Sequence, residues 1–392
     1  MTIALSQAAP ASLITPAALL DEPRLMHNLR RMQQRMDTLG VALRPHVKTA
    51  KCIEVAQRQR ALGARGITVS TLKEAETFFD AGFDDILYAV GIAPGKLDAV
   101  RALRQRGCRL TVLVDSVAAA EAVVQAVVRA ERQAERQADA ALEVLIEIDT
   151  DDHRAGVKPD AGVLLDIGRT LHRGGAVLRG VMTHAGASYE CYTSEALAAM
   201  AEQERAGCVQ AAGRLRAAGL PCPVVSVGST PTALSARRLD GVTEVRAGVY
   251  VFHDLVMVNV GVAGLEELAL SVLASVIGHR PDKGWVLVDA GWMAMSRDRG
   301  TQTQPVDYGY GAVCDEAGQP IDGLVMSSAN QEHGVLSWRD GRIDPALMER
   351  FALGTRLRIL PNHACATAAQ FGHYAVLTAD GTLAQWERMN GW

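Results

Sequence analysis

Short apolar runs rich in β-branched residues alternate with longer helix-like segments through the first two thirds of the chain. Eight such runs occur: LRPHVK from Leu43, GITVS from Gly66, DILYAV from Asp85, RLTVLVD from Arg109, EVLIEID from Glu143, LRGVMTH from Leu178, VVSVGS from Val224 and EVRAGVYV from Glu244. The segments between them, such as TLKEAETFFDAG and SEALAAMAEQERAGCVQAAGRLRAAG, are rich in Ala, Leu, Glu and Arg and end in glycine, as helices commonly do.

This alternation predicts parallel strands joined by helical crossovers. Eight strands of this kind fit a closed (β/α)8 barrel. A doubly wound open sheet is the alternative, but no glycine-rich dinucleotide-binding turn follows the first run. The charged segment ERQAERQADAA is interpreted as a solvated helix without a function of its own.

The alternation stops after about Val258, and the rest of the chain is strand-like and rich in turns. ALSVLASVIGH, GWVLVDAG and GTRLRILPNHAC have the character of strands, and YAVLTADGTLAQWER places Asp-Gly between apolar runs, which predicts a hairpin. We therefore expect a barrel domain over residues 22–258. A β-rich domain is expected over residues 259–392, together with about residues 1–21.

Composition narrows the functional classes. A chain of 392 residues is long for a single core, which agrees with a large and a smaller domain. The formal net charge of -4 gives no sign of a basic surface for nucleic acid or anionic lipid, so a small molecule is the expected partner. The first twenty residues lack the basic segment of a secretion signal, and the seven scattered cysteines do not suggest a disulfide framework. A soluble protein of the cytoplasm is expected.

Lys48 is the first candidate for chemistry, because it lies at the end of the first predicted strand. In barrels of this kind catalytic residues occupy the carboxyl ends of the strands, although a lysine at a strand end can simply extend its ammonium into solvent. The loops after the last two predicted strands, VGSTPT and RAGVY, contain small residues whose backbone amides suit a phosphate. An amine together with a phosphate-binding loop is what pyridoxal phosphate requires.

Several motifs spread over nearly the whole chain share a family resemblance. They are RPHVKT around Lys48, GITVSTLKEAE, HRAGV from His153, THAGASY from Thr183 and PNHACAT from Pro361. Together they resemble the D-serine dehydratase and D-threonine aldolase family. The resemblance implies an alanine-racemase-type (fold type III) barrel, a lysine near the N-terminus that binds pyridoxal phosphate, a C-terminal β domain, a divalent metal ion and a homodimer.

The resemblance also implies roles for individual residues. Lys48 is expected to bind the cofactor covalently, and Arg154 and Tyr189 to lie against its ring. A phenol at the pyridine nitrogen would make the ring a weaker electron sink than a carboxylate would. The residues expected to hold the phosphate are Gly228, Ser229, Thr230, Gly248, Val249 and Tyr250.

His363 and Cys365 form the predicted metal site. On a strand, residues two apart point to one face, so an imidazole and a thiolate can bind the same ion and leave positions open for substrate. A His-x-Cys pair by itself is frequently a coincidence, but within PNHACAT it resembles the metal motif of the family. The dehydratase branch has cysteine at the second position, where the aldolase branch typically has aspartate. A thiolate suits zinc, and manganese, cobalt and magnesium remain open.

The expected activity is dehydration of a D-3-hydroxy amino acid, such as D-threo-3-hydroxyaspartate or D-serine, to a keto acid and ammonia. Position 50 is alanine where the family often has histidine, which puts D-serine in doubt and leaves room for a more acidic substrate. Arg297 and Arg299 in SRDRG are candidates for binding a second carboxylate. The alternatives are an aldolase and a non-catalytic carrier of pyridoxal phosphate. Carriers of this kind lack a second domain, which argues against that alternative.

Overall fold

The computed structural model describes residues 12–133 and 141–392, and it divides the chain into two compact units. One unit contains residues 1–31, 49–54 and 249–390, and the other contains residues 32–48, 55–248 and 391–392. We call them the β-rich unit and the barrel unit. Helix α1 (Glu22–Thr38) contributes residues to both. Residues 134–140 of the charged segment ERQAERQADAA lie outside the described residues, and residues 131–133 end a helix.

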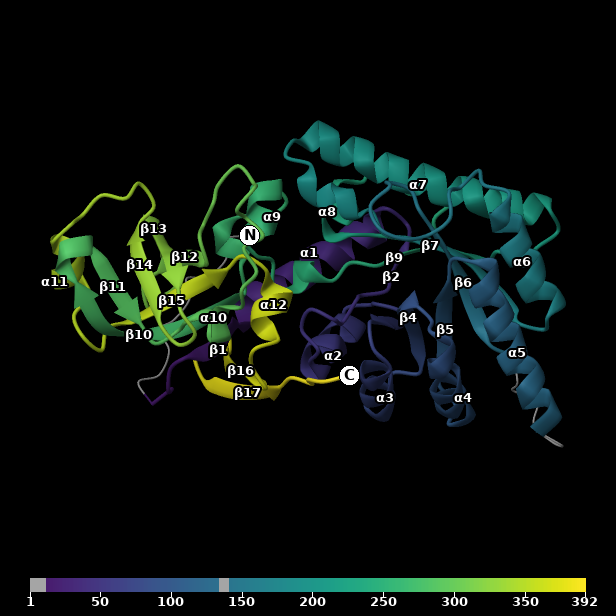
Figure 1. The fold of residues 1–392 in the computed structure, drawn as a ribbon, viewed down its shortest axis with the longest axis horizontal. Coiled ribbons are helices and arrows are strands. Elements are labelled where there is room, and N and C mark those ends of the chain that lie inside the picture. The colour runs from purple at the N-terminus through teal and green to yellow at the C-terminus, as the bar shows by residue number, and fades with distance from the viewer. Residues whose placement is uncertain (1–11, 134–140) are drawn as a thin grey trace. The chain divides into compact units, whose positions relative to one another are not determined.

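The barrel unit is built on an eight-stranded parallel sheet, seen in the purple to teal part of Figure 1. Its strands are β2 (Ala42–Leu43), β3 (Ile67–Val69), β4 (Asp85–Gly91), β5 (Arg109–Val114), β6 (Glu143–Ile148), β7 (Val177–Thr183), β8 (Val224–Val227) and β9 (Glu244–Val245). They are ordered β2-β9-β8-β7-β6-β5-β4-β3, and a parallel bridge between His46 and Thr68 joins the two ends of the sheet. This arrangement confirms the predicted barrel.

Helices connect these strands. They are α2 (Ile53–Ala61), α3 (Leu72–Asp80), α4 (Leu97–Gln105), α5 (Val117–Gln133), α6 (Val163–Arg173), α7 (Ser194–Ala217) and α8 (Thr230–Ser235). The two helices expected from TLKEAETFFDAG and SEALAAMAEQERAG are α3 and α7, and each begins after a threonine whose hydroxyl caps its first turn, Thr71 and Thr193. Leu87, Leu113, Leu145 and Met182 come from four neighbouring strands and pack into one buried cluster.

The first and last barrel strands are shorter than their apolar runs predict. The run from Glu244 was expected to be a strand throughout, but β9 ends at Val245 and Val249–Val251 form a 3₁₀ turn. Backbone bonds continue the pairing a little further, since the N–H of Arg246 donates to the Val227 carbonyl. From Val249 on, the chain belongs to the β-rich unit.

The β-rich unit contains a nine-stranded sheet, coloured green to yellow apart from β1 in Figure 1. The strands are β1 (Ala17–Asp21), β10 (Leu270–Arg280), β11 (Trp285–Val288), β12 (Gly311–Cys314), β13 (Pro320–Ala329), β14 (Gly334–Trp338), β15 (Arg356–Pro361), β16 (His373–Leu377) and β17 (Leu383–Glu387). Because β10 pairs with both β11 and β15, six of these strands close into an antiparallel barrel around a buried apolar core.

The remaining strands and helices of the β-rich unit extend this barrel. β1 pairs with β10 and β16, and β16 and β17 form an antiparallel hairpin whose loop contains Gly381 at φ +84°, so the Asp-Gly hairpin is confirmed. The short helices are α9 (Leu255–Val260), α10 (Trp292–Met295), α11 (Ala346–Arg350) and α12 (Ala364–Ala368). No helix in the described residues has the length and apolar character that a membrane span requires. All seven cysteines are free thiols.

Candidate active site

Lys48 lies in the turn that follows β2, where the parallel strands end. Its side chain is exposed, and within the described residues it pairs with no carboxylate. The backbone N–H of Lys48 donates to Nδ1 of His46 at 3.4 Å, so Nε2 carries the proton that faces Ser70 Oγ, also at 3.4 Å. Burial, and then the charge of Lys48, hold the pKa of His46 well below its usual range. A primary amine therefore sits beside a neutral imidazole.

A second neutral imidazole comes from the loop after β7. Nδ1 of His184 lies 2.9 Å from the Gly228 carbonyl and donates to it, which leaves Nε2 as an acceptor. Burial is the main cause that lowers the pKa of His184 to about 3. Arg246, in the segment after β9, is buried and donates to Ser226 Oγ at 2.9 Å and to the Thr183 carbonyl. The ends of β2, β7 and β9 thus supply an amine, two neutral rings and a guanidinium.

Glu204 of α7 ties two of these loops together. Its Oε1 accepts the N–H groups of Ala185 and Gly228, each at 3.0 Å, and burial raises the pKa of this carboxyl. Gly228 has φ +139°, and a Cβ there would lie 2.2 Å from the Arg246 carbonyl oxygen. Only glycine therefore allows the loop to approach the neighbouring strand so closely.

The two predicted phosphate loops follow the neighbouring strands β8 and β9. In the first loop, Ser229 caps α8 by accepting the Thr232 N–H at 3.2 Å, and its hydroxyl lies 2.8 Å from that of Ser188. The second loop comprises Gly248, Val249 and Tyr250. Thr230 and Tyr250 are each 1% exposed. A glycine-restricted turn and an amine free of carboxylates fit a phosphate-bearing aldehyde cofactor.

Arg154 and Tyr189 have different surroundings. The guanidinium of Arg154 is 58% exposed and lies 3.6 Å from Glu147, which is on β6. The ring centroid of Tyr189 lies 6.4 Å from that of His184, with the two planes tilted by 56°. The structure thus brings Tyr189 together with His184 at the end of the barrel, while Arg154 lies in the loop after β6 and is exposed.

The metal motif lies in the β-rich unit, and its predicted local structure is wrong. His363 and Cys365 were expected on a strand, but β15 ends at Pro361 and α12 begins at Ala364. His363 is the extended residue just before this helix, with φ -132° and ψ 105°. The Ala364 N–H donates to the Asp254 carboxylate at 2.9 Å, and this long-range cap starts the helix. The side chains of the pair converge across the helix start.

Two carboxylates and a hydroxyl hold this motif. Nδ1 of His363 lies 2.6 Å from Asp298 Oδ2, and the hydroxyl of Thr49 lies 3.2 Å from Cys365 Sγ. Burial lowers the pKa of His363, but Cys365 and Asp298 outweigh it and raise the pKa to about 11. In the carboxylate–histidine arrangement of metal sites, a carboxylate holds one ring nitrogen and the other binds the ion. The donor set fits one divalent ion with two protein ligands.

Asp254 anchors the backbone of the same motif. It is 1% exposed, and while Oδ2 accepts the Ala364 N–H, Oδ1 accepts the Met257 N–H at 3.0 Å and caps α9. Burial raises the pKa of Asp254 to about 6. Within residues 12–133 and 141–392, no group of three or more His, Cys, Asp or Glu side chains could hold a metal ion. A metal at this motif would therefore keep open positions for other ligands.

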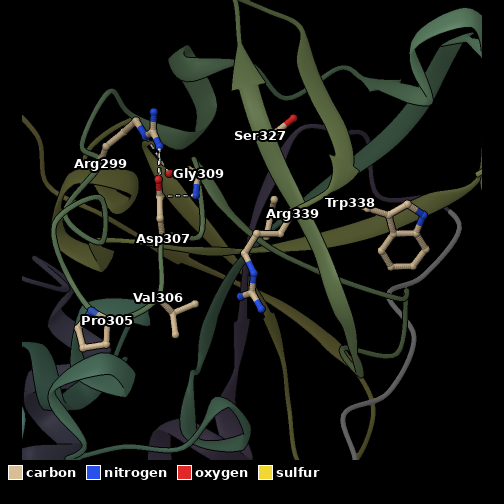
Figure 2. Close-up of a pocket in the computed structure, with 9 residues that line it drawn as sticks. Arg299, Pro305, Val306, Asp307, Gly309, Ser327, Trp338 and Arg339 are labelled. Carbon is tan, nitrogen blue, oxygen red and sulfur yellow. Dashed lines mark hydrogen bonds and ion pairs between the residues drawn. The ribbon is translucent and has the colours of Figure 1, made fainter. Parts of the chain in front are cut away.

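The two arginines considered for a second carboxylate differ in their contacts. Arg299 binds Asp307 through contacts of 2.8 and 3.1 Å and also reaches the Gly309 carbonyl. These residues line one side of an open pocket of about 500 Å³ (Figure 2), with Arg339 on another side. Arg297 is exposed and stacks over the Trp292 ring at 4.2 Å. Arg299 is thus occupied by its own ion pair, and Arg297 is the more accessible of the two.

Several of these residues were not among the predicted site residues. His184 and Arg246 lie within the apolar runs predicted as strands, and the structure places them just after β7 and β9, so their position at strand ends was the available signal. Glu204 stands in a helix rich in alanine, glutamate and arginine and has no local signal. Asp298 lies between Arg297 and Arg299, and Asp254 stands 109 positions before His363 in the chain. Only the folded chain brings these carboxylates to the motif.

Comparison with known proteins relates both units to known domains. Residues 20–255 match the model of the alanine racemase N-terminal domain, and residues 269–377 match a putative serine dehydratase domain. The chain is 64% identical to D-threo-3-hydroxyaspartate dehydratase of Delftia sp. (strain HT23) over 97% of this chain and 98% of that protein. It is 32% identical to a D-threonine aldolase of Arthrobacter sp. over 89% of this chain and 85% of that protein.

Solved structures agree with these matches. A mutant of D-threo-3-hydroxyaspartate dehydratase in the metal-free form superposes with a TM-score of 0.94, at 64% identity, covering 97% of this chain and 99% of that one. The chain belongs to the D-serine dehydratase and D-threonine aldolase family, whose barrel is of the alanine racemase type. The resemblance inferred from RPHVKT, THAGASY and PNHACAT is thereby confirmed.

Proposed function

We propose that this protein is a pyridoxal phosphate- and divalent metal-dependent dehydratase of D-3-hydroxy amino acids, with D-threo-3-hydroxyaspartate as the preferred substrate. The observation that carries the proposal is the 64% identity, over 97% of the chain, to a D-threo-3-hydroxyaspartate dehydratase. The predicted products are a keto acid and ammonia, which makes the enzyme a lyase.

We assign the cofactor to the barrel domain, residues 22–258. Bound to Lys48, pyridoxal phosphate would supply an electron sink for the bond broken at the substrate Cα. Lys48 is the residue that would bind the cofactor and, once freed by substrate, take the Cα proton as a base. The phosphate would be held by Gly228, Ser229, Thr230, Gly248, Val249 and Tyr250, with Arg154 and Tyr189 against the ring.

His46 and His184 support this assignment electrostatically. Their low pKa values keep both rings uncharged beside Lys48. An uncharged neighbour does not add to the positive charge of the site, so the amine is not opposed by two imidazolium ions when it takes up a proton. The hydrogen bond from the Lys48 backbone to His46 holds the backbone that carries the amine.

We assign the metal to residues 259–392, with residues 1–21 completing that domain. His363 and Cys365 would bind one divalent ion, and zinc, manganese, cobalt or magnesium is the candidate. When bound, the ion supplies Lewis acidity for the departure of the β-hydroxyl, which is a poor leaving group. Asp298 would keep the His363 ring turned so that Nε2 faces the ion.

The acidic substrate is supported by two features of this chain. Position 50 is alanine, 3% exposed, which leaves out an imidazole that the family often has there. Arg297 is exposed beside Asp298 and stacks on Trp292, so its guanidinium keeps its polar edge available for a carboxylate. We propose Arg297, ahead of Arg299, as the cation for the second carboxylate.

An aldolase is the second candidate, because the chain is also 32% identical to a D-threonine aldolase. Removal of the hydroxyl proton instead of the Cα proton would break the Cα–Cβ bond and release an aldehyde. Cys365 favours dehydration, since cysteine is typical of the dehydratase branch at this position. A carrier without turnover remains the alternative of another class, and the β-rich unit argues against it.

The deciding experiment measures two products separately. The purified protein, supplied with pyridoxal phosphate and divalent metal, is incubated with D-threo-3-hydroxyaspartate, D-serine and D-threonine, and ammonia and aldehyde are quantified in each sample. L-threo-3-hydroxyaspartate is the matched stereochemical control. We expect ammonia and keto acid from the D-hydroxyaspartate at the highest rate. Aldehyde as the main product would establish the aldolase, and no product from any substrate would favour the carrier.

We further propose that the enzyme acts in the cytoplasm as a homodimer. The seven free thiols agree with a reducing compartment. Light scattering on the purified protein gives its mass, and a mass of one chain would contradict the dimer.

A further inference from the structure

Thr49, the residue after Lys48, contacts the proposed metal site. Its side chain is 0% exposed, and its hydroxyl lies 3.2 Å from the sulfur of Cys365, 316 positions away in the chain. Buried hydroxyls nearly always have a hydrogen-bond partner. Within the described residues Cys365 is the only side-chain partner of Thr49.

Other groups fix the backbone around Thr49. Residues 49–54 group with the β-rich unit, where Tyr374 Oη donates to the Ala50 carbonyl at 2.7 Å and the Met389 N–H donates to the Lys51 carbonyl at 2.9 Å. Tyr374 is itself fully buried and packs edge-on against Phe252. The segment is therefore anchored without the hydroxyl of Thr49, so that hydroxyl is available for a more specific role.

We propose that Thr49 is a positioning residue for the metal-binding thiolate of Cys365, an inference that rests on the metal site of the proposed function. With sulfur bound to an ion as thiolate, the hydroxyl is the donor and the sulfur the acceptor. A hydrogen bond to an anion is stronger than one between neutral groups. Threonine is also β-branched and has few accessible χ1 rotamers, so it presents its hydroxyl in a fixed direction.

This role completes the support of the His-Ala-Cys motif. Asp298 holds the ring of His363, Asp254 holds the backbone N–H of Ala364, and Thr49 holds the sulfur of Cys365. Each of the three consecutive residues is thus held by a different segment. Groups that orient metal ligands typically change metal affinity about 10- to 100-fold when they are removed. The hydroxyl of Thr49 belongs to that class.

The test uses metal ions alone as probes on the full-length protein. Thr49→Val removes the hydroxyl at nearly constant volume, and Thr49→Ser retains it. The control is Thr355→Val, because the side chain of Thr355 makes no hydrogen bond within the described residues. Zinc affinity is measured by competition with a fluorescent chelator. Cobalt binding is followed by the thiolate-to-cobalt absorption band, which reports on the sulfur itself.

We expect Thr49→Val to weaken zinc binding about 10- to 100-fold and to shift or weaken the cobalt–thiolate band. Thr49→Ser and Thr355→Val should match the parent. Parental affinity and an unchanged band in Thr49→Val would overturn the inference, and so would an equal loss in Thr49→Ser, which would show that the methyl group matters. A parent protein with no thiolate band at all would refute the metal site of the proposed function, and the role of Thr49 with it.

Discussion

The end of the barrel and the His363–Cys365 motif hold their histidines in opposite ways. His46 and His184 bond to backbone groups, the Lys48 N–H and the Gly228 carbonyl, and their pKa values are lowered. His363 bonds to a side-chain carboxylate, that of Asp298, and its pKa is raised to about 11 despite burial. Burial lowers the pKa of all three rings, and the nearby cations Lys48 and Arg246 lower the pKa values of the barrel histidines further, whereas the anions around His363 outweigh its burial.

This contrast bears on how far each site can be recognised from the sequence. The barrel residues follow consecutive parallel strands, so topology alone gathers them at one end. The motif depends on Asp298 and Asp254, which lie 65 and 110 positions from the groups they bind. A site built on strand order can be predicted from a repeated pattern, whereas a site built on remote carboxylates requires the folded chain.

The largest effect is expected from removing the amine of the barrel site. Lys48→Ala should lose the covalent cofactor absorbance and reduce turnover by about 10²- to 10⁴-fold or more, because the variant lacks both the cofactor attachment and the base. Borohydride reduction of the parent followed by peptide mapping identifies the modified lysine. A reduced adduct at Lys51 or any other lysine would contradict the assignment.

Removing the metal should distinguish the contribution of the metal site from that of the cofactor site. In His363→Ala, or after chelation, we expect the cofactor absorbance to stay nearly intact while ammonia release falls by orders of magnitude, because only the leaving-group step needs the ion. Added divalent metal should rescue the chelated parent but not the variant. Cys365→Asp should retain some metal and increase the share of aldehyde among the products. Full activity in a metal-free preparation would mean that the pair is structural.

A smaller effect is expected at Asp298. Asp298→Asn keeps the size of the side chain but removes the negative charge that faces His363 Nδ1, so metal affinity should fall about 10- to 100-fold. Chelator competition measures this change. Asp307→Asn, in the nearby ion pair with Arg299, is the control and should leave metal affinity unchanged. Equal affinities in the parent and Asp298→Asn would show that the carboxylate does not orient the ring.

The smallest effect concerns pH and the barrel histidines. The pKa of His184 is about 3 in the folded protein and about 6.5 in the unfolded chain. Between about pH 3 and pH 6.5 the unfolded chain therefore binds more protons at this residue than the folded protein does. This contribution to the free energy of unfolding is complete above about pH 6.5 and is lost as the pH falls, by at most about 1.4 kcal/mol per pH unit. Urea unfolding of the parent and of His184→Asn between about pH 7 and 5 measures how steeply the free energy of unfolding falls with pH. The same pH dependence in both proteins would contradict a contribution from His184.

Local patterns in the sequence were sufficient for the architecture. The alternation of apolar runs with helical segments predicted the parallel barrel, and Asp-Gly between apolar runs predicted the hairpin of β16 and β17. Lys48 was predicted at the carboxyl end of the first strand, because such ends share one end of a parallel barrel. In the structure β2 ends at Leu43 and Lys48 lies in the turn that follows. These features depend on residues that are near one another in sequence or that repeat in order.

Tertiary structure alone decided the details of both sites. His363 and Cys365 were expected on a strand, yet the remote cap from Asp254 starts a helix between them. Glu204 joins two loops from the middle of an ordinary-looking helix, and Thr49 meets Cys365 across 316 positions. Such contacts produce no repeating pattern in the sequence. Each one depends on a single side chain meeting a residue that is distant in the chain and near only in the folded protein. The sequence by itself therefore determined the frame and indicated candidate reactive residues, and only the folded chain decided which groups contact them.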